Sequence, residues 1–173
     1  MNRLVIDSNI IDYCCELGLT KSFFEKLDIE IWVPTYVKNE ILNSKKEKLI
    51  NKLSEIEFKR IGFFGFADNP NALGFGQGSF YSNEYDDFIN NTSEKHRNDR
   101  FIALLSKVNN AIFMTRDNKI FKDACINKVR ALFIPKDEKS YNKAIQYSEH
   151  VYYNLIWTKE KFRKIIDEGS LFK

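Results

Sequence analysis

Short apolar segments alternate with helical patterns at both ends of the first 135 residues. The apolar runs 4–6 and 29–33 enclose residues with helical spacing, and the runs 111–114 and 131–134 enclose another helical segment. Strands that alternate with helices are typical of β-α-β units, in which the strands are parallel. The sequence therefore predicts an α/β fold built on a parallel sheet.

The helices can be delimited from capping residues and apolar spacing. The first begins where Ser8 or Asn9 can cap it and ends before Gly18, and Thr35 can cap a later one. The expected helices after the first are 21–27, 35–42, 45–57, 93–108 and 118–128. Residues 62–82 are rich in glycine and phenylalanine and are expected to form an irregular surface loop, with aromatic rings that either pack inward or stack on unpaired bases.

The length of the chain fits one ordinary domain. Residues 1–135 are expected to form its α/β part. Residues 136–173 are expected to be a C-terminal helical extension packed on the same domain, with a charged connection and then a helix that begins near Thr158 and ends before Gly169.

Composition restricts the function classes. The net charge of +3 is too weak to indicate a nucleic-acid binder from its overall field, so a polyanion site would have to arise from local patterning. The longest apolar run, 101–105, is far shorter than the roughly 20 residues of a membrane span. Residues 1–6 lead directly to Asp7 without a signal-peptide core, so a cytoplasmic location is expected.

Two strands end in an acid. Asp7 follows the run 4–6 directly, and Asp117 ends the segment 112–117, which begins within the run 111–114. Ligands of open α/β sheets gather at the carboxyl ends of the strands, where these two acids would meet. Taken singly, each could instead be a helix N-cap.

Two further acids lie on helices with extensive apolar surface. Glu40 stands between Val37 and Ile41, on the stripe expected to face the core, and Asp99 lies on a helix that is apolar on both sides. A carboxylate on an apolar surface is costly unless it is paired or binds a cation. We therefore expect the four acids to converge.

Converging carboxylates indicate a hard divalent cation. Oxygen-only ligation suits Mg²⁺ or Mn²⁺, and the three cysteines lack zinc-site spacing. Two such ions about 4 Å apart can activate a water and stabilise the leaving oxygen of a phosphodiester. The basic residues beside Asp99 and Asp117 would hold the phosphate backbone, and they include Arg97, Arg100, Arg116 and Lys119.

Four ordered segments of the chain resemble PIN-domain ribonucleases. They are residues 5–9, 33–34 with 40–41, 97–99 with 102–103, and 114–117, so the similarity spans residues 1 to about 135. It implies a PIN-like nuclease domain with a three-layer α/β/α sandwich and a mainly parallel central sheet. It also implies Mg²⁺- or Mn²⁺-dependent cleavage of single-stranded RNA by Asp7, Glu40, Asp99 and Asp117, with Thr115, Ser8 or Asn9 orienting ligands or the attacking water.

Small bacterial members of this family include VapC-type toxins, which dimerise and are silenced by an antitoxin. The segment 62–82 and the extension beyond Pro135 do not match those toxins. Asp123 is a further acid that could join the metal site, although helical acids are usually solvated. A catalytically inactive PIN-like module that binds RNA or protein is the alternative. A haloacid-dehalogenase-type phosphatase is disfavoured because its second acid is replaced by Asn9.

Overall fold

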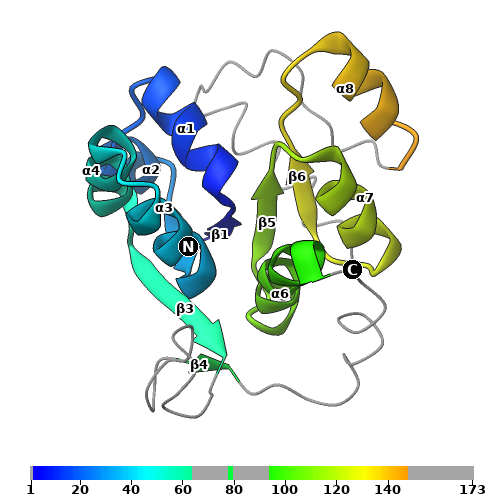
Figure 1. Cartoon of the computed structure of the whole chain (residues 1–173), viewed down its shortest axis with the longest axis horizontal. Helices are drawn as coiled ribbons and strands as arrows, with labels where there is room; N and C mark the ends of the chain where they lie inside the picture. The colour runs from blue at the N-terminus through cyan, green and yellow to red at the C-terminus, as the bar shows by residue number, and fades with distance from the viewer. Residues whose placement is uncertain (1, 64–77, 80–93, 148–173) are drawn as a thin grey trace.

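A parallel sheet forms the centre of the molecule (Figure 1). The computed structural model describes residues 2–63, 78–79 and 94–147. Every strand pair is parallel, and the strands lie in the order β4-β3-β2-β1-β5-β6. The strands are β1 (Asn2–Ile6), β2 (Ile29–Pro34), β3 (Lys59–Phe63), β4 (Gly78–Ser79), β5 (Ile112–Thr115) and β6 (Ala131–Phe133). The predicted α/β class with a parallel sheet is confirmed.

Helices flank this sheet on both sides (Figure 1). The chain moves from β1 to β2 and β3 in one direction, and later from β5 to β6 in the other. Because parallel crossovers are right-handed, the two directions place their helices on opposite faces. The helices are α1 (Ser8–Glu16), α2 (Lys21–Lys26), α3 (Thr35–Asn43), α4 (Glu47–Ile56), α6 (Glu94–Val108), α7 (Asn118–Ile126) and α8 (Glu138–Ala144).

The core lies on both faces of the central strands. All four residues of β5 and all three of β6 are buried, as are the last three of β1. Strands covered on both faces have continuous apolar sequences, which explains why these runs could be recognised. Residues 102–106 of α6 are all buried, so the expectation that this helix is enclosed on two sides is confirmed.

Several local predictions were wrong. Asp7, not Ser8 or Asn9, caps α1, and Pro34 occupies the N-cap position of α3. Thr35 is instead the first residue of α3, and its hydroxyl donates to the carbonyl of Ile61 on β3, 3.1 Å away. This bond ties the start of α3 to the neighbouring strand.

Three elements were not predicted: β3, β4 and α8. Strand β4 and residues 62–63 of β3 pair within the segment 62–82, so the expectation of an irregular loop was wrong at these positions. Strand β3 has Lys59 and Arg60 exposed and Ile61 buried, so it has no apolar run. Helix α8 packs on α7 and buries Ala144. The expected C-terminal helix and most of the segment 62–82 lie outside the described residues. In the part of the chain that is described, no helix has the length and apolarity needed to cross a membrane.

Replacement of a core phenylalanine tests the position of β5. Phe113 is fully buried on β5, and we expect Phe113→Ala to lower the free energy of unfolding by about 3–5 kcal/mol because it leaves a cavity. Ile126 is 63% exposed at the end of α7, so Ile126→Ala should cost under about 1 kcal/mol. Urea unfolding followed by circular dichroism measures both, and equal losses would contradict the central place of β5.

Candidate active site

The strand order reverses at the junction of β1 and β5. From β1 the chain builds one half of the sheet outward, and it returns to build the other half from β5. Ile6 is in register with Met114, and the backbone N–H of Asp7 donates to the Met114 carbonyl at 3.3 Å. Such a reversal is where α/β sheets hold ligands, at the carboxyl ends of the strands. Asp7, Thr115 and Asp117 therefore all lie at this position, as predicted from the sequence.

Asp7 is a buried carboxylate whose two oxygens are both bonded. Its side chain is 3% exposed and caps α1, with Oδ1 accepting from the Ile10 N–H at 3.2 Å. Its Oδ2 accepts a hydrogen bond from the hydroxyl of Thr115, a fully buried residue. The Thr115 oxygen in turn accepts from the backbone N–H of Asp117 at 3.0 Å. A continuous chain of hydrogen bonds thus joins the two acids.

The surroundings of Asp7 make its ionisation unfavourable. Burial raises the pKa of Asp7 to about 6 from an ordinary 3.8. Hydrogen bonds from Thr115 and Asn9 lower this pKa in part, and the nearby Asp117 carboxylate raises it further. A carboxylate that is disfavoured by burial and by a like charge is stabilised by a cation beside it. A divalent cation beside Asp7 would therefore offset this cost.

Asp117 is a helix cap as well as a neighbour of Asp7. Its Oδ1 accepts from the N–H groups of Lys119 at 2.7 Å and Ile120 at 3.2 Å, at the start of α7. Asp7 and Asp117 therefore both cap helices, which is the role that the sequence offered as the alternative to metal binding. In Asp117 both capping bonds go to the same oxygen.

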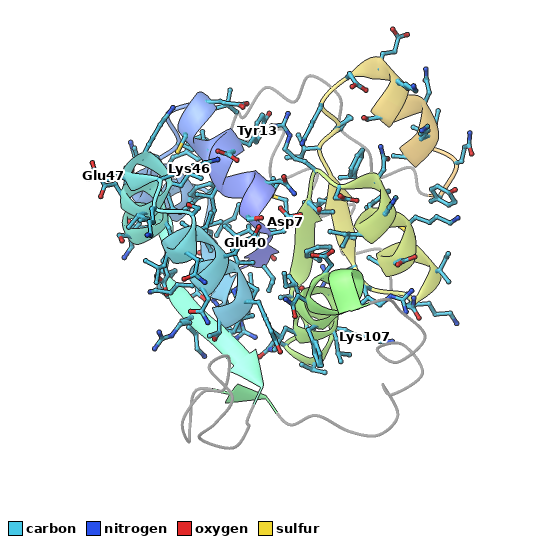
Figure 2. All side chains as sticks on the ribbon, viewed as in Figure 1. Asp7, Tyr13, Glu40, Lys46, Glu47 and Lys107 are labelled. Atoms are coloured by element: carbon cyan, nitrogen blue, oxygen red, sulfur yellow. The ribbon has the colours of Figure 1, made fainter. Side chains whose placement is uncertain are left out.

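The prediction that Glu40 lies on the buried face of its helix was wrong. Val37 and Ile41 are buried, whereas Glu40 is exposed. Figure 2 labels Glu40 on α3. At 100° per residue, Glu40 falls at the margin of the stripe that Val37 and Ile41 define, on the same side as Tyr36. The ring of Tyr36 stacks on Phe101 of α6, with centroids 5.7 Å apart. The helices that carry Glu40 and Asp99 are therefore in contact.

The full cluster of four acids is not assembled in this conformation. Asp99 is half-buried on α6. Within residues 2–63, 78–79 and 94–147, no group of three or more histidine, cysteine, aspartate or glutamate side chains is close enough together to hold a metal ion. The structure brings Asp7 together with Thr115 and Asp117, and the participation of Glu40 and Asp99 stays a prediction.

Arg116 and Asn9, two of the predicted substrate-binding residues, line one hollow at this edge. It has a volume of about 510 Å³ and is lined by Asn9, Asp12, Glu16, Arg116 and Lys136. The Arg116 guanidinium lies 4.5 Å from the centroid of the Tyr13 ring and donates to Glu16 at 3.4 Å. Its Nε is buried without a hydrogen-bond partner among the described residues.

Sequence reasoning missed Lys136 and Tyr13. Lys136 follows β6, so the rule that identified Asp7 and Asp117 as residues at strand ends could also have found it. Tyr13 lies one helical turn after Asn9 on α1, which is the spacing that puts two residues on the same side.

The other predicted substrate contacts are placed differently. Arg100 donates to Asp123 of α7, with the closest N–O distance 3.2 Å, so each has the other as an ionic partner. Lys119 is exposed, and Ser8 is half-buried in the first turn of α1. Arg97 lies within α6, but its side chain is outside the described part of the structure.

Comparisons with known proteins identify no relative of this chain. A scan against protein-family models gives no match to this chain, and searches of curated proteins and of solved structures give none either. Its function must be inferred from the residues and their geometry.

The raised pKa of Asp7 makes stability depend on pH. Because the native pKa of about 6 exceeds the ordinary 3.8, native stability falls as pH rises through this interval. In the presence of a chelator, Asp7→Asn should raise the free energy of unfolding by about 1–3 kcal/mol at pH 7.5 and by little at pH 4. Urea unfolding at both pH values measures this.

A matched variant controls for the loss of one negative charge. Asp12→Asn makes the same chemical change at an exposed position of α1. If Asp7→Asn raised the free energy of unfolding equally at pH 4 and pH 7.5, the assignment of this pH dependence to Asp7 would be contradicted.

Proposed function

We propose that this chain is a metal-dependent endoribonuclease that hydrolyses phosphodiester bonds of single-stranded RNA. The observation that carries the proposal is the Asp7 carboxylate at the strand reversal. It is bonded to Thr115, and its pKa is raised mainly by burial and in smaller part by Asp117. Such a group is costly for a fold to maintain, and perturbed carboxylates of this kind concentrate at functional sites.

The donor chemistry supports a divalent cation and a phosphodiester substrate. Asp7 and Asp117 offer carboxylate oxygens, the ligands that Mg²⁺ and Mn²⁺ prefer. When bound there, the ion would polarise a phosphoryl oxygen and lower the pKa of a water. The neighbouring hollow carries Arg116 and Lys136, two cations that can contact the backbone of RNA, beside the acids Asp12 and Glu16. The four sequence segments that resemble PIN-domain ribonucleases agree with this interpretation.

The residues of the chain then have separate roles. Asp7 and Asp117 would hold the cation, and Glu40 and Asp99 would complete its ligands. The Thr115 hydroxyl fixes the Asp7 carboxylate and links it to the backbone of Asp117. On the substrate, Arg116 and Lys119 contact phosphates. Arg116 is pre-oriented for this role because the Tyr13 ring supports its guanidinium.

A second candidate is a catalytically inactive PIN-like module that binds RNA or a protein. The observation that favours it is that no group of three or more potential metal ligands is assembled within the described residues. Protein that binds RNA but does not cut it with any divalent metal would establish this alternative. A role as the toxin of a toxin–antitoxin module would add a homodimer, an antitoxin partner and a cytoplasmic location to the primary proposal.

Removal of either central acid should abolish cleavage. We expect Asp7→Asn and Asp117→Asn to eliminate the hydrolysis of single-stranded RNA in Mg²⁺ or Mn²⁺ while the circular dichroism spectrum is retained. Asp28→Asn is the matched control, because Asp28 is exposed before β2 with a φ of 61°, which asparagine also adopts readily. Full activity in either acid variant, or in wild type with a chelator, would refute the proposal.

The metal itself should stabilise the fold. Mn²⁺ at a hundred times its dissociation constant is expected to raise the free energy of unfolding by about 3 kcal/mol, because it binds the native state alone. The same titration of Asp117→Asn should give a much smaller increase, and Asp28→Asn should behave as wild type. Thermal unfolding with and without Mn²⁺ measures this, and equal increases in all three proteins would place the ion elsewhere.

A further inference from the structure

The hollow lined by Arg116 adjoins the candidate active site from two directions. Asn9 of α1 lines it and also forms the side-chain hydrogen bond that lowers the pKa of Asp7. Arg116 lines it from the other direction and stands between Thr115 and Asp117 in the chain. A ligand held in this hollow would therefore lie beside the proposed metal ligands.

The opposite charges of this hollow differ in how far they are exposed. Its lining contains two acids and two bases, namely Asp12, Glu16, Arg116 and Lys136. The side chain of Arg116 is 12% exposed, whereas that of Glu16 is 60% exposed, and the two are 3.4 Å apart between nitrogen and oxygen. Glu16 is therefore the outer member of this ion pair. A ligand that enters from solvent can displace Glu16 more easily than it can move Arg116.

The fold makes little use of the hydrogen-bonding capacity of Arg116. A guanidinium has five N–H donors. Among the described residues, the bond to Glu16 is the one hydrogen bond that the Arg116 side chain donates, and its Nε is buried without a partner. The Tyr13 ring, whose centroid is 4.5 Å from the guanidinium carbon, supports the group through its π face and uses none of these donors. Arg116 therefore keeps a support when its bond to Glu16 is broken.

The carboxylate of Glu16 and a phosphate offer the same chemistry to Arg116. Both present negatively charged oxygens that accept hydrogen bonds from a guanidinium, and both can do so with two oxygens at once. An ion pair with an exposed partner contributes little to stability, and salt screens it. The contact between Glu16 and Arg116 can therefore be exchanged for a phosphate contact at little cost to the fold.

We propose that Glu16 competes with a phosphate of the RNA for Arg116 and thereby limits the affinity of this site for RNA. The competition rests on the proposed function, which makes RNA the ligand of the hollow. In the free protein the carboxylate of Glu16 pairs with the guanidinium. In the complex a phosphate takes its place, and the Glu16 side chain turns towards solvent. Glu16 therefore sets the strength of binding and takes no part in the chemical step.

Binding of RNA without cleavage tests the competition. The affinity for a fluorescently labelled single-stranded oligouridylate is measured by anisotropy with a chelator present. We expect Glu16→Gln to tighten this affinity about threefold, the effect of one exposed ion pair, and to do so most at low salt. Asp12→Asn is the matched control, because it removes the same charge from the same hollow, whereas Arg116 has Glu16 as its ionic partner among the described residues. An equal increase in affinity in both variants would show a general field effect and overturn the competition.

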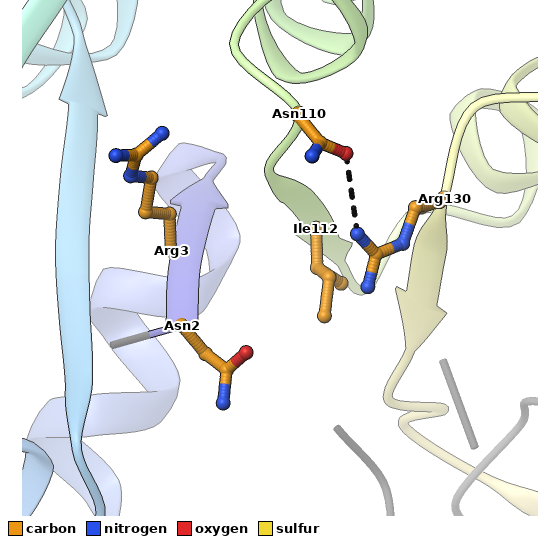
Figure 3. Close-up of a pocket in the computed structure, with 5 residues that line it drawn as sticks. All are labelled: Asn2, Arg3, Asn110, Ile112 and Arg130. Carbon is orange, nitrogen blue, oxygen red and sulfur yellow. Dashed lines mark hydrogen bonds between the residues drawn. The ribbon is translucent and has the colours of Figure 1, made fainter. Parts of the chain in front are cut away.

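A double-mutant cycle assigns the effect to Arg116. Arg116→Gln should weaken the affinity about tenfold, and in this background Glu16→Gln should leave the affinity unchanged because no guanidinium remains to compete for. Arg130→Gln is the control for the loss of an arginine. Arg130 precedes β6 at the opposite edge of the sheet, where it donates to the side-chain oxygen of Asn110 at 3.4 Å (Figure 3). If Glu16→Gln tightened the affinity equally with and without Arg116, the competition would be refuted.

Steady-state kinetics separates the competition from the proposed function. In Mn²⁺, Glu16→Gln should lower the KM for single-stranded RNA and leave kcat unchanged, because substrate and transition state gain the same contact. A fall in kcat would give Glu16 a part in the chemical step and overturn its proposed role. Protein that shows the expected binding but cuts RNA with no divalent metal would refute the nuclease alone. Protein that cuts RNA but whose affinity is unchanged by Glu16→Gln would refute the competition alone, and protein that neither binds nor cuts would refute both.

Discussion

The hydrogen bond from the Thr115 hydroxyl to the Asp7 carboxylate joins the two strands at which the chain reverses its course through the sheet. Asp7 is only 3% exposed. Without this bond, its buried carboxylate would lose the hydroxyl of Thr115 as a hydrogen-bond donor. A buried polar group left without its partner costs about 1–3 kcal/mol, and a charged one costs more. The position of Asp117 depends on the same hydroxyl, which accepts from its backbone N–H. Fold and candidate site therefore share one local network.

The two acids of this network serve structure and proposed chemistry together. Asp7 satisfies an orphan N–H group of α1, and Asp117 satisfies two of α7. Capping fixes each carboxylate relative to a helix axis, which is the precision that a ligand site needs. Helix capping and ligand binding are therefore compatible roles for one side chain here.

The sequence was most informative where burial was complete. The runs of β1, β5 and β6 are buried on both faces, so their continuous apolar character identified the strands and the acids that follow them. Strand β3 was missed because Lys59 and Arg60 are exposed at its start. Glu40 was misplaced because helical periodicity gives an angle but not the width of the buried stripe. The contacts of Arg116 with Tyr13 and Glu16 are tertiary, and no local pattern specifies them.

The pairing of β1 with β5 has a consequence for how the chain tolerates changes in length. Thr115 and Asp7 are 108 residues apart, so their contact closes a long loop, at an entropic cost of about 4 kcal/mol. That cost grows only with the logarithm of loop length, and about thirty added residues would raise it by ~0.2 kcal/mol. The free-energy cost of pairing β1 with β5 therefore depends little on the length of chain between β3 and α6. Insertions there can change what the protein contacts without weakening the junction of β1 and β5.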